Sequence, residues 1–445
     1  MKKFYDRDSE MSVLKKIQNQ SYTDYSRFVI LTGRRRVGKT SLIYHLMKET
    51  SNIAPSLYFF VGRKTESVLV STFIVEVREK LDEYIPSSIN TFRELFQFLL
   101  EIGKRRKFTL FIDEFQEFIN INHAIFSDIQ ELWDRYRKQT NICLITSGSI
   151  FRMMEKIFKD KEEPLFGRED CSIHLQAFST NTIREILSDY KPDYTNEDLL
   201  ALWTITGGVA RYIELFMNNG CTTPEKMIHY ICMSGDSFFL DEGENILVKE
   251  FGKQYGTYFS ILGQIAGGDV TQSQIEASLN MTSLGGQLKI LDEKYEIIAK
   301  KRSIGAKPNS QTVRYEIRDN FFRFWFRYIS RYSSLIELGN MPALEKIMLN
   351  DYTTFSGISL VRWFRKKLME SFRYKEIGGW WQSKDNEYEI DIVAEPLEGD
   401  VEVYEVKRNK DRYRPALLGQ KVEVMKQKLF HNKNIIFSCL SLEDM

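Results

Sequence analysis

Residues 27–50 read RFVILTGRRRVGKTSLIYHLMKET, and this stretch decides the fold. The segment from Gly33 to Thr40 matches G-x-x-x-x-G-K-[ST] at every fixed position. A short apolar run precedes it and a helix-forming run follows it, so we expect the order strand, loop, helix. Glycines in such a loop let backbone N–H groups point at phosphate oxygens, and the helix adds its positive N-terminal end. The sequence therefore predicts a site for the phosphates of a nucleotide.

Two side chains of this loop carry the expected chemistry. Lys39 would place a positive charge on the β and γ phosphates, and Thr40 would offer its hydroxyl to Mg²⁺. The three arginines fall at variable positions, so at least one should face solvent or a partner. The alternative is a glycine turn that carries a surface lysine. The expected nucleotide-binding residues of the loop are Gly33, Arg34, Arg35, Arg36, Val37, Gly38, Lys39, Thr40 and Ser41.

A second apolar run, FTLFIDE, ends in the carboxylates Asp113 and Glu114. In parallel α/β sheets ligands lie at the carboxyl ends of the strands. Asp113 is therefore expected to hold Mg²⁺ through water, and Glu114 to orient or deprotonate the attacking water. An acidic pair in a solvated loop is the alternative.

A third run, ICLITSGS, ends in small hydroxyl residues. Ser147 fits a polar sensor between the two nucleotide motifs, and Thr146 fits that role less well. Ser149 could instead cap the helix that begins IFRMMEKIF.

Short β-rich runs alternate with helical stretches up to about residue 176, which is typical of a parallel α/β sheet. We expect four regions: a nucleotide-binding core (1–180), a helical lid (181–245), a winged helix-turn-helix (246–320) and an α/β region with a helical lead-in (321–445). The third region rests on three short helices followed by the strands Tyr295–Lys301 and Thr312–Ile317. Its third helix carries few cations, so it could equally be a packing module or a DNA reader. The aromatic run 321–328 is apolar nearly all round and predicts a core helix.

The order of the motifs GRRRVGKT, LFIDEFQEF, LITSGS, EPLFGRED and TGGVARYIELF resembles prokaryotic AAA+-type ATPases with a C-terminal restriction-endonuclease-like domain. It is also similar to the STAND and origin-binding branches of P-loop ATPases. The resemblance implies a P-loop AAA+-type parallel sheet with a helical lid, then a winged helix-turn-helix, then an α/β nuclease-like domain. It implies ATP and Mg²⁺ as cofactors, and a homo-oligomer is compatible with it.

The same resemblance implies roles for three arginines. Arg7 lies in the opening FYDRDSE, which resembles a motif that packs near the adenine. Arg211 occupies the place of a sensor touching the γ-phosphate, and Arg168 that of an arginine finger to a neighbouring subunit. The structural alternatives are that Arg168 pairs with Glu163 or Asp170 and that Arg211 covers a helix surface.

A second candidate site lies near the C-terminus, in EIDIV followed by VEVYEVK. Side chains alternate along strands, so a hairpin would bring Asp391 beside Glu405 and Lys407. Glu370, at the end of an upstream helix, could project toward them. The carboxylates Asp391, Glu405 and Glu370 are the expected metal ligands, and Lys407 would activate water. The pattern resembles the PD-(D/E)XK nuclease core, with Gln420 at the accessory position; the alternative is an exposed, salt-bridged hairpin.

Basic residues flank this site and suggest a phosphate-bearing partner such as DNA. A solvated, lysine-rich surface is the alternative. The cations are Lys407, Arg408, Lys410, Arg412 and Arg414, with Arg362, Arg365, Lys366 and Lys367 on the preceding helix.

The composition argues against a membrane protein, a disulfide-rich protein and a structural zinc protein. The 445 residues include 62 Lys plus Arg against 61 Asp plus Glu, so any polyanion must bind a local patch. The apolar runs are far shorter than the ~20 residues of a membrane helix, and the first residues form no apolar signal core. The five cysteines are scattered, which argues against a disulfide framework or a structural zinc site. We expect a cytoplasmic protein without membrane partners.

These observations lead to three hypotheses about the function. In the first, ATP controls a metal-dependent DNA endonuclease. In the second, ATP drives a regulatory switch whose C-terminal domain only binds DNA or a protein. In the third, the chain is a scaffold that binds ATP and hardly hydrolyses it. The presence of Glu114 favours hydrolysis, and the presence of Asp391, Glu405 and Lys407 favours cleavage.

Overall fold

The computed structural model describes residues 1–233, 238–252, 255–268, 270–307, 310, 313–382, 388–431 and 433–445. It divides into two compact units, one made of residues 6–176 and the other of residues 1–5 with 177–445. The first boundary lies close to the predicted end of the nucleotide-binding core at residue 180. Thr312, where a strand was expected to begin, lies outside the described residues.

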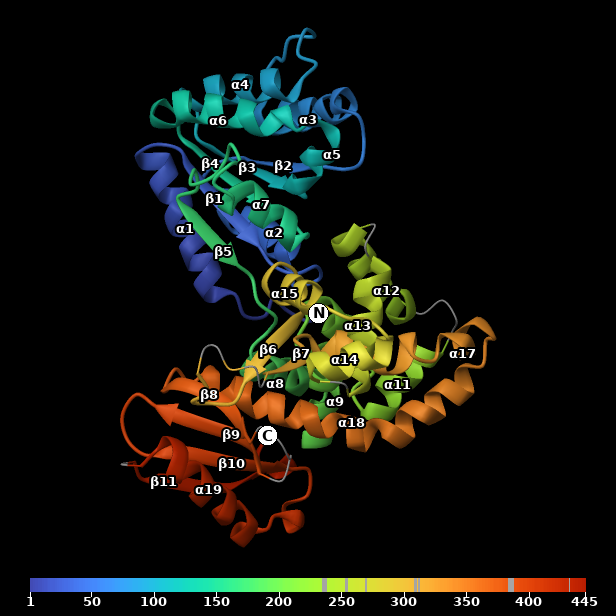
Figure 1. Cartoon of the computed structure of the whole chain (residues 1–445). Helices are drawn as coiled ribbons and strands as arrows, with labels where there is room; N and C mark the ends of the chain where they lie inside the picture. The colour runs from blue at the N-terminus through green and yellow to red at the C-terminus, as the bar shows by residue number, and fades with distance from the viewer. Residues whose placement is uncertain are drawn as a thin grey trace. The chain divides into compact units, whose positions relative to one another are not determined.

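Residues 6–176 form a five-stranded parallel sheet in the order β2-β3-β4-β1-β5, with helices on both faces (Figure 1). The sequence predicts strands at residues 28–31, 57–61, 109–112, 142–146 and 172–175, and the observed strands lie within one residue of these bounds at each end. They are β1 (Arg27–Thr32), β2 (Ser56–Phe60), β3 (Phe108–Asp113), β4 (Ile142–Ser147) and β5 (Cys171–His174). The helices are α1 (Asp8–Thr23), α2 (Lys39–Thr50), α3 (Glu66–Leu81), α4 (Phe92–Gly103), α5 (Phe118–Ile121), α6 (Ala124–Tyr136) and α7 (Phe151–Lys159).

The two faces of this sheet have different covers. Figure 1 shows α3, α4 and α6 grouped on one side, where Phe59 and Phe73 stack with ring centroids 4.2 Å apart. On the other side α1 contacts β1 and β4, and Gln18 of α1 donates a 2.8 Å hydrogen bond to the hydroxyl of Thr109. Strands buried on both faces read as continuous apolar runs, which is why the sequence located them.

The second unit begins with helices that correspond to the expected lid and winged-helix regions. The lid helices are α8 (Thr180–Tyr190), α9 (Asn196–Thr206), α10 (Ala210–Asn218), α11 (Pro224–Cys232) and α12 (Phe238–Phe251). Next come α13 (Tyr255–Gly267), α14 (Gln272–Leu279), α15 (Gly285–Glu293) and the antiparallel hairpin of β6 (Ile298–Arg302) and β7 (Val313–Ile317). Three helices followed by a hairpin are therefore present, as predicted.

The aromatic run is a core helix, as expected. It forms α16 (Asn320–Phe324) and a π-helical turn (Trp325–Ser330), with all of its Phe and Trp side chains buried. After α17 (Ser333–Glu337), the 29-residue α18 (Met341–Met369) runs along α9 and α11 (Figure 1). Trp203 of α9 donates its indole N–H to the carbonyl of Ser359 in α18 at 2.9 Å. The three expected C-terminal regions thus contribute to one shared hydrophobic core. A second cluster, which includes Val393, Val403 and Leu418, lies between the C-terminal sheet and α19.

The C-terminal sheet has the order β11-β10-β9-β8. Its elements are β8 (Tyr374–Trp381), β9 (Glu389–Pro396), β10 (Val401–Lys407), α19 (Pro415–Leu429) and β11 (Ile435–Ser441). Strands β8 and β10 are both antiparallel to β9, and β11 runs parallel to β10. The sequence did not predict β8.

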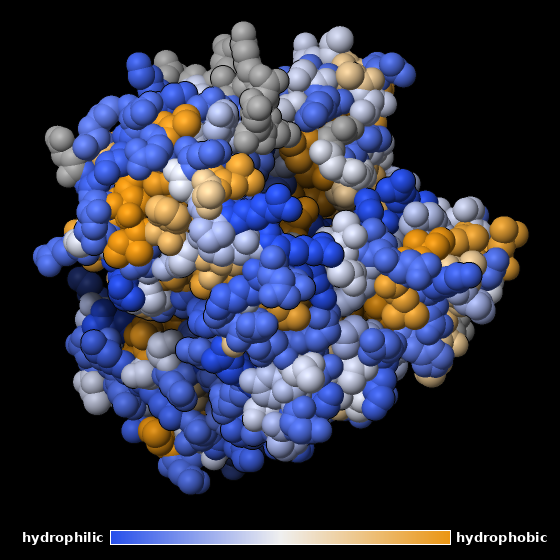
Figure 2. Space-filling view, turned by 90° about the horizontal axis from the view of Figure 1, so that it is seen from below, coloured by the Kyte–Doolittle hydropathy of each residue, from blue (hydrophilic) through white to orange (hydrophobic). Residues whose placement is uncertain are grey.

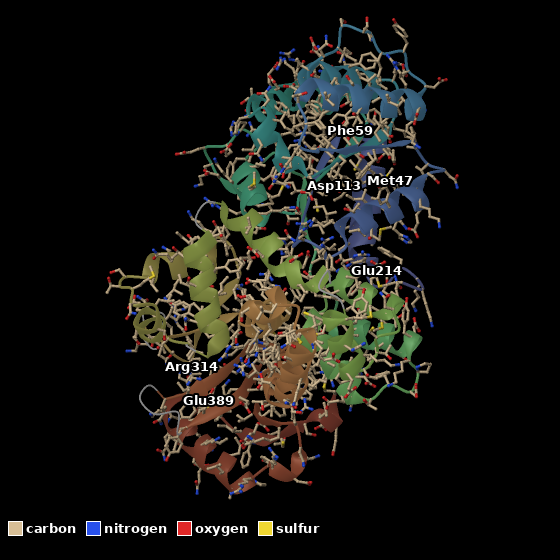
Figure 3. All side chains as sticks on the ribbon, turned by 90° about the vertical axis from the view of Figure 1, so that its right-hand side faces the viewer. Met47, Phe59, Asp113, Glu214, Arg314 and Glu389 are labelled. Carbon is tan, nitrogen blue, oxygen red and sulfur yellow. The ribbon has the colours of Figure 1, made fainter. Side chains whose placement is uncertain are left out.

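The segment after β6 lies against the β8 edge of this sheet. The amide of Ile304 donates to the carbonyl of Gly379 at 2.9 Å, and the amide of Trp381 donates to the hydroxyl of Ser303 at 3.0 Å. Arg314 of β7 also pairs with Glu389 at 2.8 Å. Both residues are labelled in Figure 3. The hairpin is therefore fixed to the C-terminal sheet.

Within the described part of the chain, none of the helices has both the length and the apolar composition needed to cross a bilayer. Hydrophilic residues cover most of the face seen in Figure 2, and the hydrophobic ones form separate patches.

Candidate functional site

The loop after β1 has positive φ angles at its two fixed glycines, as the motif predicts. Gly33 has φ +144° and Gly38 has φ +101°, in the region that favours glycine. A Cβ atom on Gly33 would lie 2.6 Å from the carbonyl oxygen of Leu175, so a side chain does not fit there. Arg36 also has a positive φ of 74°. The fixed glycines therefore serve both the backbone conformation and the close approach of β5.

Lys39 lies within the loop that precedes it. Its side chain is buried, and its Nζ donates to the carbonyl oxygens of Gly33 at 2.7 Å and Arg34 at 3.0 Å. Thr40 and Ser41 follow in the exposed first turn of α2, whereas Val37 is buried as packing. The contact of this ammonium with phosphates stays a prediction of the sequence motif.

Asp113, at the end of β3 and labelled in Figure 3, accepts hydrogen bonds from four groups. Ser147 and the amide of Glu114 donate to its Oδ1 at 2.5 and 3.0 Å. Thr40 and Tyr58 donate to its Oδ2 at 3.1 and 2.7 Å. Four donors around one buried carboxylate fix its orientation. The structure thus brings together the predicted Thr40, Asp113 and Ser147.

Tyr58 is a member of this group that sequence reasoning missed. Its ring lies against that of Tyr44 in α2, with centroids 5.0 Å apart. Burial raises the pKa of Tyr58, and the Asp113 carboxylate raises it further, so the phenol stays a donor. Only the neighbouring position of β2 and β3 in the sheet reveals this contact, and strand order is not readable from one sequence.

Glu114 is held at the start of the turn after β3, with φ +55°. Ser149 donates to its Oε2 at 2.7 Å, and the side-chain amide of Gln116 donates to the same oxygen. The alternative role of Ser149 as a helix cap is therefore wrong, because α7 begins after Ile150 without a side-chain cap. Ser149 and Gln116 position the carboxylate that was expected to act on water.

Arg7 reaches the phosphate loop, but through a backbone carbonyl. Its Nη2 donates to the carbonyl oxygens of Val37 at 3.2 Å and Gln176 at 2.7 Å, and its Nη1 pairs with Glu10 at 3.4 Å. The side chain is buried, and this burial lowers the pKa of Arg7 although the nearby carboxylates oppose the change. These contacts connect the opening motif with the loop.

The two other arginines contact neighbouring carboxylates. Arg168 donates to the carbonyl of Phe166 at 2.8 Å and pairs with Asp134 at 3.2 Å, rather than with Glu163 or Asp170. Arg211, in α10 of the other unit, pairs with Glu214 at 2.7 Å and is about half exposed. The sensor and finger roles thus stay predictions.

The C-terminal hairpin brings the expected pair of carboxylates to neighbouring strands. The amide of Val406 donates to Asp391 Oδ2 at 2.8 Å, while Glu405 Oε1 pairs with Lys407 at 2.8 Å. Burial raises the pKa of Asp391 against the opposing Val406 amide and Lys407 cation. Lys421 of α19 lies 3.8 Å from Glu405 Oε1, whereas the neighbouring Gln420 is exposed. Among the described residues, Glu405 Oε2 is buried without a hydrogen-bond partner.

Glu370 does not join this pair. Its carboxylate accepts from the backbone N–H of Thr180 at 3.0 Å and from the Thr180 hydroxyl, at the N-terminus of α8. Lys366 pairs with it at 3.0 Å. The structure therefore assigns Glu370 to capping α8, because α18 ends at Met369 and turns the side chain toward that helix. No group of three or more His, Cys, Asp or Glu side chains arranged for a metal is present among the residues described.

Most of the cations expected to face DNA instead contact carboxylates or backbone carbonyls of their own unit. Arg362 donates to the carbonyl of Ile317 and pairs with Glu316, and Arg365 donates to the carbonyl of Asp391. Although burial opposes it, the cations of Arg362 and Lys301 lower the pKa of Glu316 to about 2. Arg408 pairs with Glu197 of α9, and Lys366 and Lys367 with Glu370 and the Asp444 carbonyl. Lys410, Arg412 and Arg414 are the members of the basic flank that are exposed.

Known protein families match two parts of this chain. Residues 4–216 match a family described as an ATPase domain predominantly from Archaea. Residues 325–417 match a family described as archaeal and bacterial proteins of unknown function. An uncharacterized protein of Methanocaldococcus jannaschii is 27% identical over 401 residues, which are 88% of this chain and 84% of that protein.

Among solved structures, the Walker-type ATPase of Pyrococcus abyssi is similar, with a TM-score of 0.55 and 18% identity. The match covers 73% of this chain and 96% of that one, and at this identity it shows the fold alone. The predicted AAA+-type sheet followed by a C-terminal α/β region is confirmed. Residues 4–216 are therefore similar to an archaeal-type P-loop ATPase domain.

Proposed function

We propose that this protein is a magnesium-dependent ATPase whose nucleotide state controls the C-terminal domain, which acts on or binds DNA. The observation that carries the first half is the arrangement around Asp113, where the hydroxyl of the phosphate loop and the carboxylate after β3 meet at 3.1 Å. Thr40 and Asp113 offer the hard oxygen ligands that Mg²⁺ prefers, so the residues present fit the ion. When bound, the ion would neutralise charge on the β and γ phosphates.

Different groups of the chain then bind the phosphates, accept the proton and position the carboxylates. The backbone N–H groups of the loop bind the phosphates, and Lys39 exchanges its carbonyl partners for phosphate oxygens. Glu114, oriented by Ser149 and Gln116, accepts the proton of the attacking water. The new O–P bond forms as the bond to the β-phosphate oxygen breaks, which releases ADP and phosphate. Ser147 keeps Asp113 oriented.

The proposal for the C-terminal domain rests on its topology and on its carboxylates. One helix, three antiparallel strands, a helix and a parallel fourth strand resemble the PD-(D/E)XK core noted in the sequence. Asp391 and the orphaned Oε2 of Glu405 would hold a metal ion, and Lys407 would orient water.

A second function, a regulatory switch with a domain that binds without cutting, is favoured by a different observation. Glu405 already pairs with Lys407 and is near Lys421, and Glu370 caps a helix elsewhere. Two carboxylates beside two lysines hold a metal ion less strongly than three carboxylates would, because the cations neutralise the ligand charge.

ATP hydrolysis should be measured in wild type, Glu114→Gln and Lys39→Ala. We expect Glu114→Gln to bind nucleotide and lose turnover, and Lys39→Ala to lose binding. Turnover by Glu114→Gln at the wild-type rate would remove Glu114 from the mechanism.

Cleavage of linear and circular DNA with Mg²⁺ or Mn²⁺, with and without ATP, separates the two proposals for the C-terminal domain. Asp391→Ala is the control. Cleavage that this variant loses supports the nuclease, and DNA binding without cleavage supports the switch.

A further inference from the structure

The chain passes between the two units at two places, after Tyr5 and after Gln176. Arg7 is the second residue beyond the first crossing. Its Nη2 donates at 2.7 Å to the carbonyl of Gln176, which is the residue directly before the second crossing. The side chain of Arg7, which follows the first crossing in the sequence, therefore contacts the residue that precedes the second crossing.

The same nitrogen also donates to the phosphate loop. Nη2 lies 3.2 Å from the carbonyl oxygen of Val37, and the arginine is only 5% exposed. The two hydrogens of one amino group thus serve one carbonyl of the loop and one carbonyl of the crossing. Glu10 pairs with the other amino group, Nη1, at 3.4 Å.

The planarity of the peptide bond gives this contact a consequence for phosphate binding. In a trans peptide the C=O and the N–H point in opposite directions. Because Arg7 holds the carbonyl of Val37, it also fixes the direction of the N–H of Gly38, the second fixed glycine of the loop. An anion that accepts from this N–H polarises the peptide and strengthens the bond from its carbonyl to Arg7.

We propose that Arg7 couples occupation of the phosphate loop to the conformation of the Gln176–Ala177 crossing. The proposal rests on the nucleotide site proposed above. Phosphate on the Gly38 N–H strengthens the hold of Arg7 on Val37, and this keeps Nη2 where Gln176 accepts from it. Coupling is reciprocal, so an ordered crossing also favours nucleotide binding.

Two local features support a mechanical role for this segment. Asp6 and Arg7 are consecutive non-glycine residues with positive φ angles, 59° and 78°. Such a backbone persists only where its surroundings hold it, here with the Asp6 carboxylate accepting from the Arg7 amide at 2.8 Å. Leu175, directly before Gln176, has its carbonyl in the space that a side chain on Gly33 would need. The loop therefore lies against the residue that precedes Gln176.

The test is amide hydrogen exchange of the full-length chain, read on fragments that cover residues 174–180. It is done without nucleotide and with a saturating, non-hydrolysable ATP analogue and Mg²⁺. Binding of the analogue is measured separately by titration. In wild type we expect exchange at 176–178 to slow about fivefold or more, at the low end of typical coupling between sites.

Arg7→Gln should bind the analogue at higher concentration and show no slowing at saturation. Glu10→Gln is the matched control, because it removes the negative charge that pairs with Nη1 and leaves the two contacts of Nη2. It should retain the slowing. Arg7→Lys keeps the cation and should retain part of it, which separates coupling from a general loss of structure.

The outcomes distinguish the two proposals. If wild type binds no analogue, the nucleotide site fails and the coupling fails with it. If wild type binds and hydrolyses ATP but exchange at 176–178 does not change, only the coupling is refuted. Slowing of the wild-type size in Arg7→Gln would also refute it.

Discussion

Removing the carboxylate of Glu370 should lower stability without affecting chemistry. The sequence suggested that this residue binds a metal, whereas its carboxylate accepts from the N–H and the hydroxyl of Thr180 at the start of α8. A hydrogen bond to a charged group contributes about 1.5–3 kcal/mol. A carboxylate at a helix N-terminus adds about 0.3–1 kcal/mol. Because the side chain is 24% exposed and these contributions overlap, we expect Glu370→Ala to cost about 2 kcal/mol. Glu370→Gln should cost about 1 kcal/mol, since its amide oxygen still accepts from Thr180.

Urea unfolding followed by tryptophan fluorescence measures this loss selectively. Five of the six tryptophans lie beyond residue 177, so the signal reports mainly on the unit that contains α8. With a slope of about 2–3 kcal/mol per molar urea, a loss of about 2 kcal/mol moves the midpoint down by roughly 0.7–1 M. Lys366→Gln, which removes only the partly exposed ion-pair partner, should cost at most about 0.5 kcal/mol. An unchanged midpoint in Glu370→Ala, or loss of DNA cleavage in a stable Glu370→Gln, would refute the capping assignment.

Three further predictions concern single contacts. Gly33→Ala should weaken nucleotide binding and lower the melting temperature, because the new methyl group would lie 2.6 Å from a backbone oxygen at φ +144°; titration with a fluorescent ATP analogue measures the first effect. Tyr58→Phe should destabilise residues 6–176 by about 1.5–3 kcal/mol, because it removes a donor to the buried Asp113. Amide hydrogen exchange of fragments from residues 6–176 reports on that unit, and unchanged protection would mean that the bond contributes nothing. The pKa of Glu316 lies near 2, below its ordinary 4.5, so its contribution to stability is complete above pH 4.5 and is lost as pH falls toward 2. Acid unfolding of Glu316→Gln should accordingly depend less on pH in that range than wild type, and equal slopes would contradict this.

The nucleotide-binding half was largely readable from the sequence because its signals are local. A strand buried on both faces is a continuous apolar run, and the phosphate loop is one contiguous motif. The residues Lys39, Thr40, Asp113 and Ser147 lie together as expected. Tyr58 was missed because its contact with Asp113 depends on which strands are neighbours.

The C-terminal half was less readable because its cations and carboxylates are placed by tertiary contacts. On α18 the positive residues looked like a DNA-binding face, but Arg362 and Arg365 donate to backbone carbonyls of neighbouring segments. Glu370 lies only one residue beyond the end of that helix, so its direction depends on how the helix terminates. Strand β8 was missed because its sequence, YKEIGGWW, contains adjacent glycines and no regular alternation.

The contact between the β6–β7 hairpin and β8 affects how this protein can be divided for study. An exposed strand edge offers unpaired N–H and C=O groups on which another chain can add. Here the backbone N–H of Ile304 and the hydroxyl of Ser303 satisfy groups on the edge of β8. A fragment that starts at residue 321, the boundary suggested by the sequence, would lack both. In such a fragment the edge of β8 would be exposed, and a second copy of the fragment could pair with it. In the full-length chain the segment after β6 covers this edge.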